Sequence, residues 1–111
     1  MSVFDGITLR GADPGHTVRD ELLALDLRYV WCDDVSDDHL RFLIKQGRIP
    51  VVAGSPGAAP EPSRWMTAVL YSAKAERAID PAVPDACTLL IRTDVLTPSA
   101  AAKALHALAM A

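Results

Sequence analysis

The segment SDDHLRFLIKQGRIPVVAG, residues 36–54, constrains the fold most, because it specifies a helix that runs directly into a buried strand. Ser36 is suited to cap the helix, and the two aspartates after it lie where the helix dipole favours acidic side chains. Val35, just before the cap, is expected to pack on Leu40 as a hydrophobic staple. Gly47 ends the helix, and the apolar run that follows predicts a short strand.

Similar signals predict two further helices. The first begins at Thr17, which is predicted to be its N-cap, and its apolar face is Val18, Leu22 and Leu25 at helical spacing. The last is capped by Thr97, with Pro98 in its first position. Its apolar face is predicted to consist of Ala101, Leu105 and Leu108.

Four more strands are expected. Their sequences are LRYVWC (27–32), WMTAVLYS (65–72), AERAID (75–80) and CTLLIRT (87–93). The second and third would form a hairpin through a turn near Ala73 and Lys74, although a single helix over residues 64–79 competes with that interpretation. The order α-β-α-β-β-β-β-α, with short links between the last strands, predicts an α+β fold with an antiparallel sheet packed by helices. Residues 17–111 would form one domain, and residues 1–16 an N-terminal extension.

Composition restricts the classes of partner. The chain has 111 residues, a net charge of −3 and no basic block, which disfavours nucleic acid and acidic membrane surfaces. No apolar run reaches the roughly 20 residues of a spanning helix, and the N-terminus lacks the pattern of a signal peptide. A cytoplasmic location is therefore expected. The two cysteines, Cys32 and Cys87, are typical of buried thiols rather than of a disulfide.

The cluster CDDVSDDH, residues 32–39, offers a thiol, carboxylates and an imidazole. A helix cap explains the acids, and consecutive residues on a helix point about 100° apart, so they cannot converge on one metal ion. Cys32 and His39 are candidates for a thiol–imidazole pair, although a buried cysteine is the preferred interpretation. The glycines of GSPGAAP do not form a phosphate loop, because its prolines lack the N–H donors of an anion nest. We therefore predict neither a metal nor a cofactor.

A winged helix-turn-helix protein is an alternative for residues 37–52, with the wing in VVAGSPGAAPEPS. Such a wing would need basic residues to attract phosphates, and none occurs before Arg64.

From about Thr17 onward, the chain resembles the C-terminal half of bacterial papain-like cysteine peptidases of the bacteriocin-processing, double-glycine type. The order of short motifs carries the resemblance: LRYVWC, DDHLRFLIKQG, GRIPVV, Arg64-Trp65 with MTAVLYS, Asp80-Pro81, CTLLIRT and TPSAAAKALHAL. It implies a papain-like half-domain. In such peptidases a cysteine attacks the carbonyl, a histidine transfers the proton and an aspartate orients the histidine.

The resemblance implies a degenerate catalytic site. Asp80 corresponds to the aspartate, Arg64 stands at the histidine position, and the cysteine belongs to a helical half that this chain does not contain. Arginine stays protonated and cannot act as a general base. We therefore expect a non-catalytic binding or regulatory domain, such as one half of a split biosynthetic enzyme, with a protein partner or a second copy covering exposed apolar surface.

Candidate ligand-binding residues are Arg64, Trp65 and Asp80, for a peptide or a small anionic ligand. The alternative is a small enzyme with a repurposed site, in which Arg64 holds an anionic substrate and Cys32, His39 or Asp80 performs the chemistry.

Overall fold

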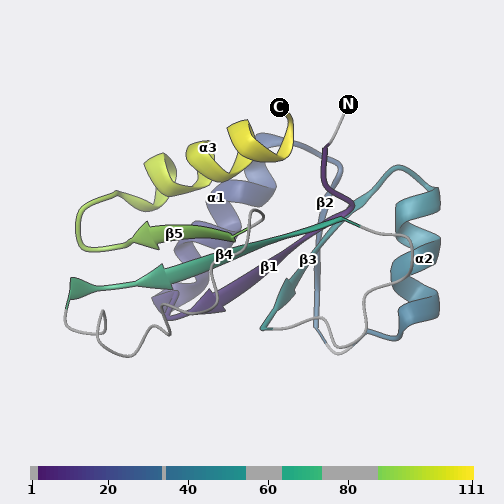
Figure 1. The fold of residues 1–111 in the computed structure, drawn as a ribbon, viewed down its shortest axis with the longest axis horizontal. Helices are drawn as coiled ribbons and strands as arrows, with labels where there is room; N and C mark the ends of the chain where they lie inside the picture. Colours follow the sequence, from purple (N-terminus) through teal and green to yellow (C-terminus); the bar gives the residue numbers. More distant parts are fainter. Residues whose placement is uncertain (1–2, 34, 55–63, 74–87) are drawn as a thin grey trace.

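The computed structural model describes residues 3–33, 35–54, 64–73 and 88–111 (Figure 1). The strands are β1 (Gly6–Gly11), β2 (Tyr29–Cys32), β3 (Ile49–Ala53), β4 (Trp65–Tyr71) and β5 (Thr88–Arg92). The helices are α1 (Thr17–Leu25), α2 (Asp37–Lys45) and α3 (Pro98–Ala109), with a short 3-10 turn, η1 (Pro14–His16), before α1. In the described part of the chain, no helix is long and apolar enough to cross a membrane.

The five strands form one sheet in the order β2-β3-β1-β4-β5, and all four neighbouring pairs are parallel. The mixture of helices and strands was predicted, but the antiparallel arrangement is wrong. The physical reason lies partly in the connections, since α1 joins β1 to β2 and α2 joins β2 to β3. A helical crossover returns the chain to the same edge of the sheet, so the strand that follows it runs parallel to the strand before it.

The N-terminal region is also placed differently from the expectation. Residues 6–11 are not part of an extension, because β1 is the central strand and pairs with β3 and β4. Ile7, Thr8 and Leu9 are all buried, at 0%, 1% and 6% exposure. The domain therefore begins before residue 17. A strand buried on both faces is typical of parallel sheets with helices on each side.

The antiparallel hairpin that was expected to include β4 is also wrong, because β4 has parallel partners on both sides. β4 pairs with β1 along one edge and with β5 along the other, so neither edge is free for an antiparallel partner. Residues 75–80, which were expected to supply that partner, lie outside the described residues. The strand interpretation of residues 65–71 is confirmed, and it excludes the alternative of one helix over residues 64–79.

Two apolar clusters cover the two faces of the sheet. The larger cluster lies between the sheet and the pair α1 and α3, which pack against each other, and it includes Leu22, Met66, Ile91 and Leu105. The smaller lies between α2 and the strands β2 and β3, and it includes Cys32, Leu40, Leu43 and Val52. β4 alternates between half-buried and buried residues, with Met66, Ala68 and Leu70 facing the larger cluster. The result is a three-layer α/β arrangement over β2 and β3.

The ends of α2 and the start of α3 agree with the predictions made from the sequence. Ser36 Oγ accepts a hydrogen bond from His39 N, and Thr97 Oγ1 accepts one from Ala100 N, so both predicted caps are confirmed. Val35 packs against the smaller cluster, which contains Leu40, in agreement with the predicted staple. Gly47 has a φ of 78°, the left-handed conformation that ends a helix.

At α1, the carboxylate of Asp13 takes the capping role that was assigned to Thr17. Its oxygens accept from the backbone N–H groups of Val18 and Arg19 at 3.0 and 3.1 Å. An aspartate can reach the first turn from this distance in sequence because the 3-10 turn folds the chain back. The side chain therefore satisfies two of the N–H groups that have no partner within the helix.

Candidate functional site

Four of the predicted site residues, Arg64, Trp65, Cys32 and His39, lie in the part of the chain that the structure describes. Arg64 lies exposed at the start of β4. Its backbone N–H donates to Asp5 Oδ2 at 2.9 Å, and its carbonyl accepts from the backbone N–H of Asp5 at 2.6 Å. Asp80, the proposed partner of Arg64, lies outside the described residues, so the pair remains a prediction.

Trp65 has a packing role in the described part of the fold. Its indole ring lies over Gly6, where a Cβ atom would collide with the ring. Its Nε1 atom is buried and has no hydrogen-bond partner among the described residues. Half-buried and pressed against the central strand, Trp65 joins β4 to the smaller apolar cluster.

Cys32 and His39 differ in their environments. Cys32 is 3% exposed within the smaller cluster, its thiol donates to the Val30 carbonyl at 3.6 Å, and burial raises its pKa above the ordinary thiol value. His39 lies exposed in the first turn of α2. A thiol with a raised pKa is a poor nucleophile, because the thiolate is the reactive form. Nor do the described residues contain a group of three or more His, Cys, Asp or Glu side chains that could hold a metal ion.

This environment predicts how Cys32 reacts with alkylating agents. In the native protein at pH 8, labelling of Cys32 by iodoacetamide should be at least tenfold slower than in urea, because the thiol is buried and protonated. Peptide mass spectrometry distinguishes Cys32 from Cys87. Rapid native labelling of Cys32, with a midpoint below pH 8, would instead support the repurposed-enzyme alternative.

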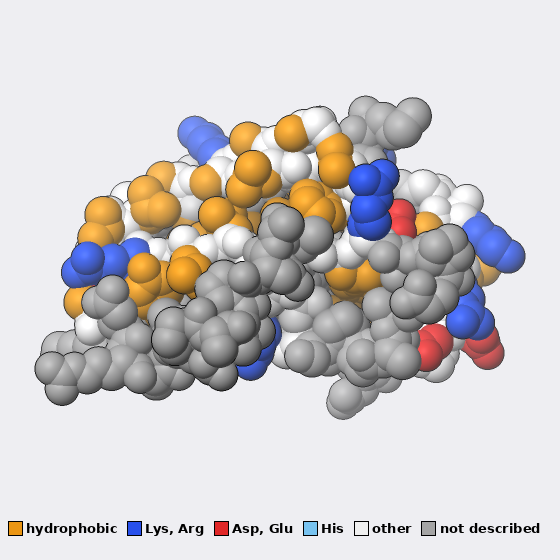
Figure 2. All heavy atoms as spheres, viewed as in Figure 1, with side chains coloured by type: hydrophobic (Ala, Val, Ile, Leu, Met, Phe, Trp, Pro, Cys, Tyr) orange, Lys and Arg blue, Asp and Glu red, His pale blue; other side chains and the backbone are white. Residues whose placement is uncertain are grey.

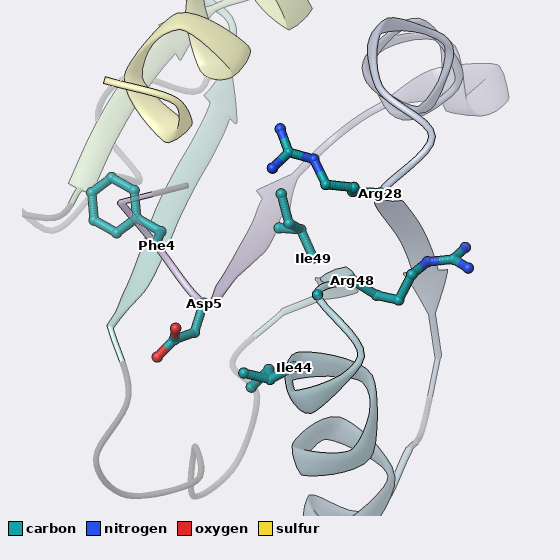
Figure 3. A pocket seen from close by; sticks show the side chains of 7 residues that line it. Phe4, Asp5, Arg28, Ile44, Arg48 and Ile49 are labelled. Carbon is teal, nitrogen blue, oxygen red and sulfur yellow. The ribbon is translucent and has the colours of Figure 1, made fainter. Parts of the chain in front are cut away.

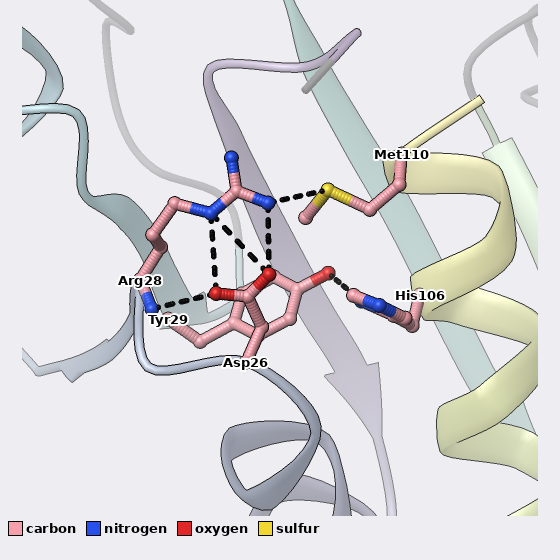
Figure 4. Close-up of polar contacts among 5 residues, drawn as sticks. All are labelled: Asp26, Arg28, Tyr29, His106 and Met110. Carbon is pink, nitrogen blue, oxygen red and sulfur yellow. Dashed lines mark hydrogen bonds and ion pairs between the residues drawn. The ribbon is translucent and has the colours of Figure 1, made fainter. Parts of the chain in front are cut away.

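The most extensive polar cluster was not predicted (Figure 4). Arg28 forms a bidentate pair with Asp26, with its Nη2 2.8 Å from Oδ2 and its Nε 3.1 Å from Oδ1. The same Nη2 lies 3.1 Å from the Met110 sulfur, and the Tyr29 hydroxyl lies 2.9 Å from His106 Nδ1. These contacts tie the turn between α1 and β2 to the C-terminal end of α3.

The electrostatics of this cluster suit a structural role. Hydrogen bonds from Arg28 lower the pKa of Asp26 to about 2, and burial raises the pKa of Tyr29 to about 12. At neutral pH, Asp26 is therefore a paired carboxylate and Tyr29 a neutral phenol. Tyr29 is only 5% exposed, so a substrate cannot reach it without opening the contact with α3.

The Asp26 pair predicts a dependence of stability on pH. Because the folded state lowers the pKa of Asp26 from 3.8 to about 2, the pair contributes fully above about pH 4, and its contribution is lost as pH falls through 2. Asp26→Asn should reduce the free energy of unfolding by about 1–2 kcal/mol at pH 7, and the difference from wild type should shrink towards pH 2. Urea titrations between pH 2 and pH 7 measure this difference in stability.

Asp20→Asn, in an exposed pair with Arg19, is the matched control and should change stability by less than about 0.5 kcal/mol. An Asp26→Asn effect that is equal at pH 7 and pH 2 would contradict the assignment.

A pocket of about 260 Å³ lies at the amino edge of the sheet (Figure 3). Phe4, Ile44 and Ile49 form its apolar walls, and the rim consists of Asp5, Arg28, Gly47 and Arg48. Figure 3 shows Phe4 and Ile49 on either side of the open space, whereas the guanidinium of Arg48 points away from it. Open parallel sheets bind their ligands at the opposite, carboxyl edge.

The described carboxyl edge has no free helix N-terminus to bind an anion. Asp13, Ser36 and Thr97 each occupy the first turn of one of the three helices with a side-chain oxygen. Their hydrogen bonds satisfy N–H groups that would otherwise cradle a phosphate.

The structure does not have the geometry of a winged helix-turn-helix, because the strand after α2 is β3, an internal parallel strand, instead of the first strand of an antiparallel wing.

Comparisons with protein-family models, with curated proteins and with solved structures give no match to this chain.

Proposed function

We propose that this chain acts by binding another protein, as a non-catalytic domain that regulates its partner or completes it. The proposal keeps the binding role that the sequence suggested. It does not depend on the papain-like resemblance, whose antiparallel sheet differs from the parallel sheet described above.

The outer face of α3 is the observation that carries the proposal. In PSAAAKALHALA, Lys103 is the only Lys, Arg, Asp or Glu. Ala101, Ala102, Leu105 and Ala109 are fully buried, yet the opposite side is also apolar, with Ala104, Ala107 and Leu108 exposed. A helix whose apolar side chains extend well beyond its core-facing side usually packs against a further neighbour.

The apolar surface continues beyond α3. Val95 and Leu96, in the turn before the helix, are 67% and 37% exposed, and Leu108 is 45% exposed. Figure 2 shows hydrophobic side chains gathered over α3 and the end of the sheet beside it. We call Val95, Leu96, Ala104, Ala107 and Leu108 the α3 surface. Exposed apolar side chains gathered on one face of a molecule are typical of protein–protein contact sites.

The small side chains of the α3 surface suit a helix as the partner's contact element. Alanines at positions 104 and 107 lie one helical turn apart and allow another backbone to approach closely, while Leu108 fits a groove between side chains. The partner expected here is a protein with an amphipathic helix, not a charged polymer.

Photo-crosslinking in the native host tests the proposal. A photoreactive residue at position 108 should give one discrete adduct, and the same residue at the exposed position Glu21 of α1 should not. With the purified pair, Leu108→Glu should weaken binding by about tenfold or more, measured by calorimetry. The absence of an adduct from position 108, or identical adducts from both positions, would overturn it.

A further inference from the structure

We propose that the outer edge of β5 takes up an extended segment of the partner protein as a sixth strand, beside the α3 surface. This inference rests on the proposed function and adds to it a second contact element of the partner. Its basis is the backbone of one edge strand, whereas the α3 surface consists of side chains.

The backbone of Leu90 points away from the rest of the sheet. β5 is the last strand in the order, and among the described strands it pairs only with β4. Thr93 N donates to the Tyr71 carbonyl at 2.8 Å, and the backbone bonds to a given neighbour alternate along a strand. Leu89 and Ile91 therefore bond to β4, while the N–H and C=O groups of Leu90 face outwards. No described residue forms a hydrogen bond with these two groups.

The sequence and the exposure of β5 leave this edge open to a further strand. TLLIR contains no proline and no charge before Arg92, whose guanidinium pairs with Asp94 in the following turn at 2.9 Å. The Leu90 side chain is 42% exposed. Natural edge strands are usually blocked by charges, proline, a bulge or a covering element. An apolar edge without these protections is suited to bind an extended backbone.

The opposite edge of the sheet is better protected. β2 has only four residues, and the Asp26 carbonyl already accepts from its first N–H, that of Tyr29, at 3.3 Å. The Arg19 guanidinium lies over the Trp31 ring, 5.0 Å from its centre, which places a charge beside this strand. Short strands and charges are the usual protection of sheet edges. β5 is therefore the edge that is suited to strand addition.

The α3 surface lies on the same side of the molecule as the outer edge of β5. His106 of α3 contacts Tyr29 of β2, which is at the far edge of the sheet. Leu108 follows His106 by two positions, or about 200° around the helix, so it faces away from β2 and towards β5. Figure 1 shows α3 next to β5. One partner can therefore contact both, with a helix on α3 and an extended segment on β5.

The chemistry of this edge specifies the segment. Its backbone must supply an N–H and a C=O to Leu90, as the residues of any extended chain without proline do. Its side chains alternate between the face that carries Leu90 and the face of the larger apolar cluster, to which Leu89 and Ile91 belong. Apolar residues suit both faces. The segment expected here is an uncharged, apolar stretch without proline at the pairing positions.

Amide hydrogen exchange, measured by NMR, tests this pairing in the complex with the partner that position 108 crosslinks. The Leu90 amide should exchange rapidly in the free chain and at least about tenfold more slowly in the complex, because its N–H becomes bonded. The amides of Leu89 and Ile91 are the controls, since both are bonded to β4 and should be protected in both states. An unchanged exchange rate of the Leu90 amide would overturn the proposal.

A pair of substitutions at position 90 gives a second measurement. Leu90→Pro removes the outward N–H without removing a bond to β4, and edge strands tolerate proline at such positions. It should raise the Kd for the partner by about tenfold or more, measured by calorimetry. Leu90→Val keeps the N–H and should change the Kd by less than about threefold. Equal effects of the two substitutions would contradict a backbone contact. If Leu90→Pro fails to fold, the exchange of the Leu90 amide decides alone.

The outcomes separate this inference from the proposed function. Binding that Leu108→Glu weakens, with an unchanged Leu90 amide, removes the strand pairing and keeps the α3 surface as the contact site. The absence of an adduct from position 108 overturns both. A dimer of the purified chain that Leu90→Pro dissociates, seen by sedimentation velocity, assigns the edge to a second copy and also overturns the inference.

Discussion

Leu105→Ala is expected to lower the free energy of unfolding by about 2–5 kcal/mol. Leu105 is fully buried between α3, α1 and the sheet, and its loss leaves a cavity in the larger apolar cluster. For a single small domain, this is a large fraction of the total stability. Urea unfolding monitored by circular dichroism measures the change, with an unchanged slope confirming that the unfolded state is not altered.

Leu108→Ala is the matched control for Leu105→Ala. It makes the same substitution in the same helix, at a position that is 45% exposed, and should cost less than about 1 kcal/mol. Equal effects at the two positions would mean that α3 docks on the sheet through a different face.

Gly11→Ala should destabilise the protein by about 3 kcal/mol or more. Gly11 ends β1 with a φ of 95°, where an L side chain is strained, and a Cβ there would collide with the backbone carbonyl oxygen of Leu70. Because that oxygen belongs to the neighbouring strand, the collision can be relieved only by moving β1 and β4 apart. Thermal unfolding by calorimetry should show a clear fall in Tm.

Gly54→Ala separates the two causes of the Gly11→Ala effect, which are backbone strain and collision with a neighbouring strand. Gly54 also has a positive φ, 75°, but a Cβ there would have no atom within 4 Å. It therefore carries the conformational strain without the collision, and should cost about 1–2 kcal/mol. A Gly11→Ala effect no larger than that of Gly54→Ala would contradict the close approach of β1 to β4.

Local signals in the sequence predicted most of the elements but not their assembly. The caps at Ser36 and Thr97 depend on neighbouring residues, which is why they could be predicted. The direction of the strands depends on long-range pairing, and neither β-branched content nor apolar runs distinguish parallel from antiparallel partners. The sequence feature that does indicate parallel strands is a helix between two strands, because such a helix favours a parallel crossover.

β1 was missed because its sequence, GITLRG, is short and was assigned to an N-terminal extension. Its pairing with β3 and β4, which lie far along the chain, identifies it as a strand. The candidate surfaces were missed for a related reason. Leu108 fitted the apolar period of α3 and was expected to be buried, whereas it is 45% exposed and the adjacent Ala109 is fully buried.

The position of β1 has a consequence for synthesis on the ribosome. The strand that emerges first is the one at the centre of the sheet, and its partners, which include Val51 and Met66, are made much later. Until β4 has left the exit tunnel, both edges of β1 lack their hydrogen-bond partners and its apolar side chains remain in water. Nascent chains stalled before residue 71 should therefore be captured by chaperones and cut readily by proteases, and protection should appear only after β4 has left the tunnel.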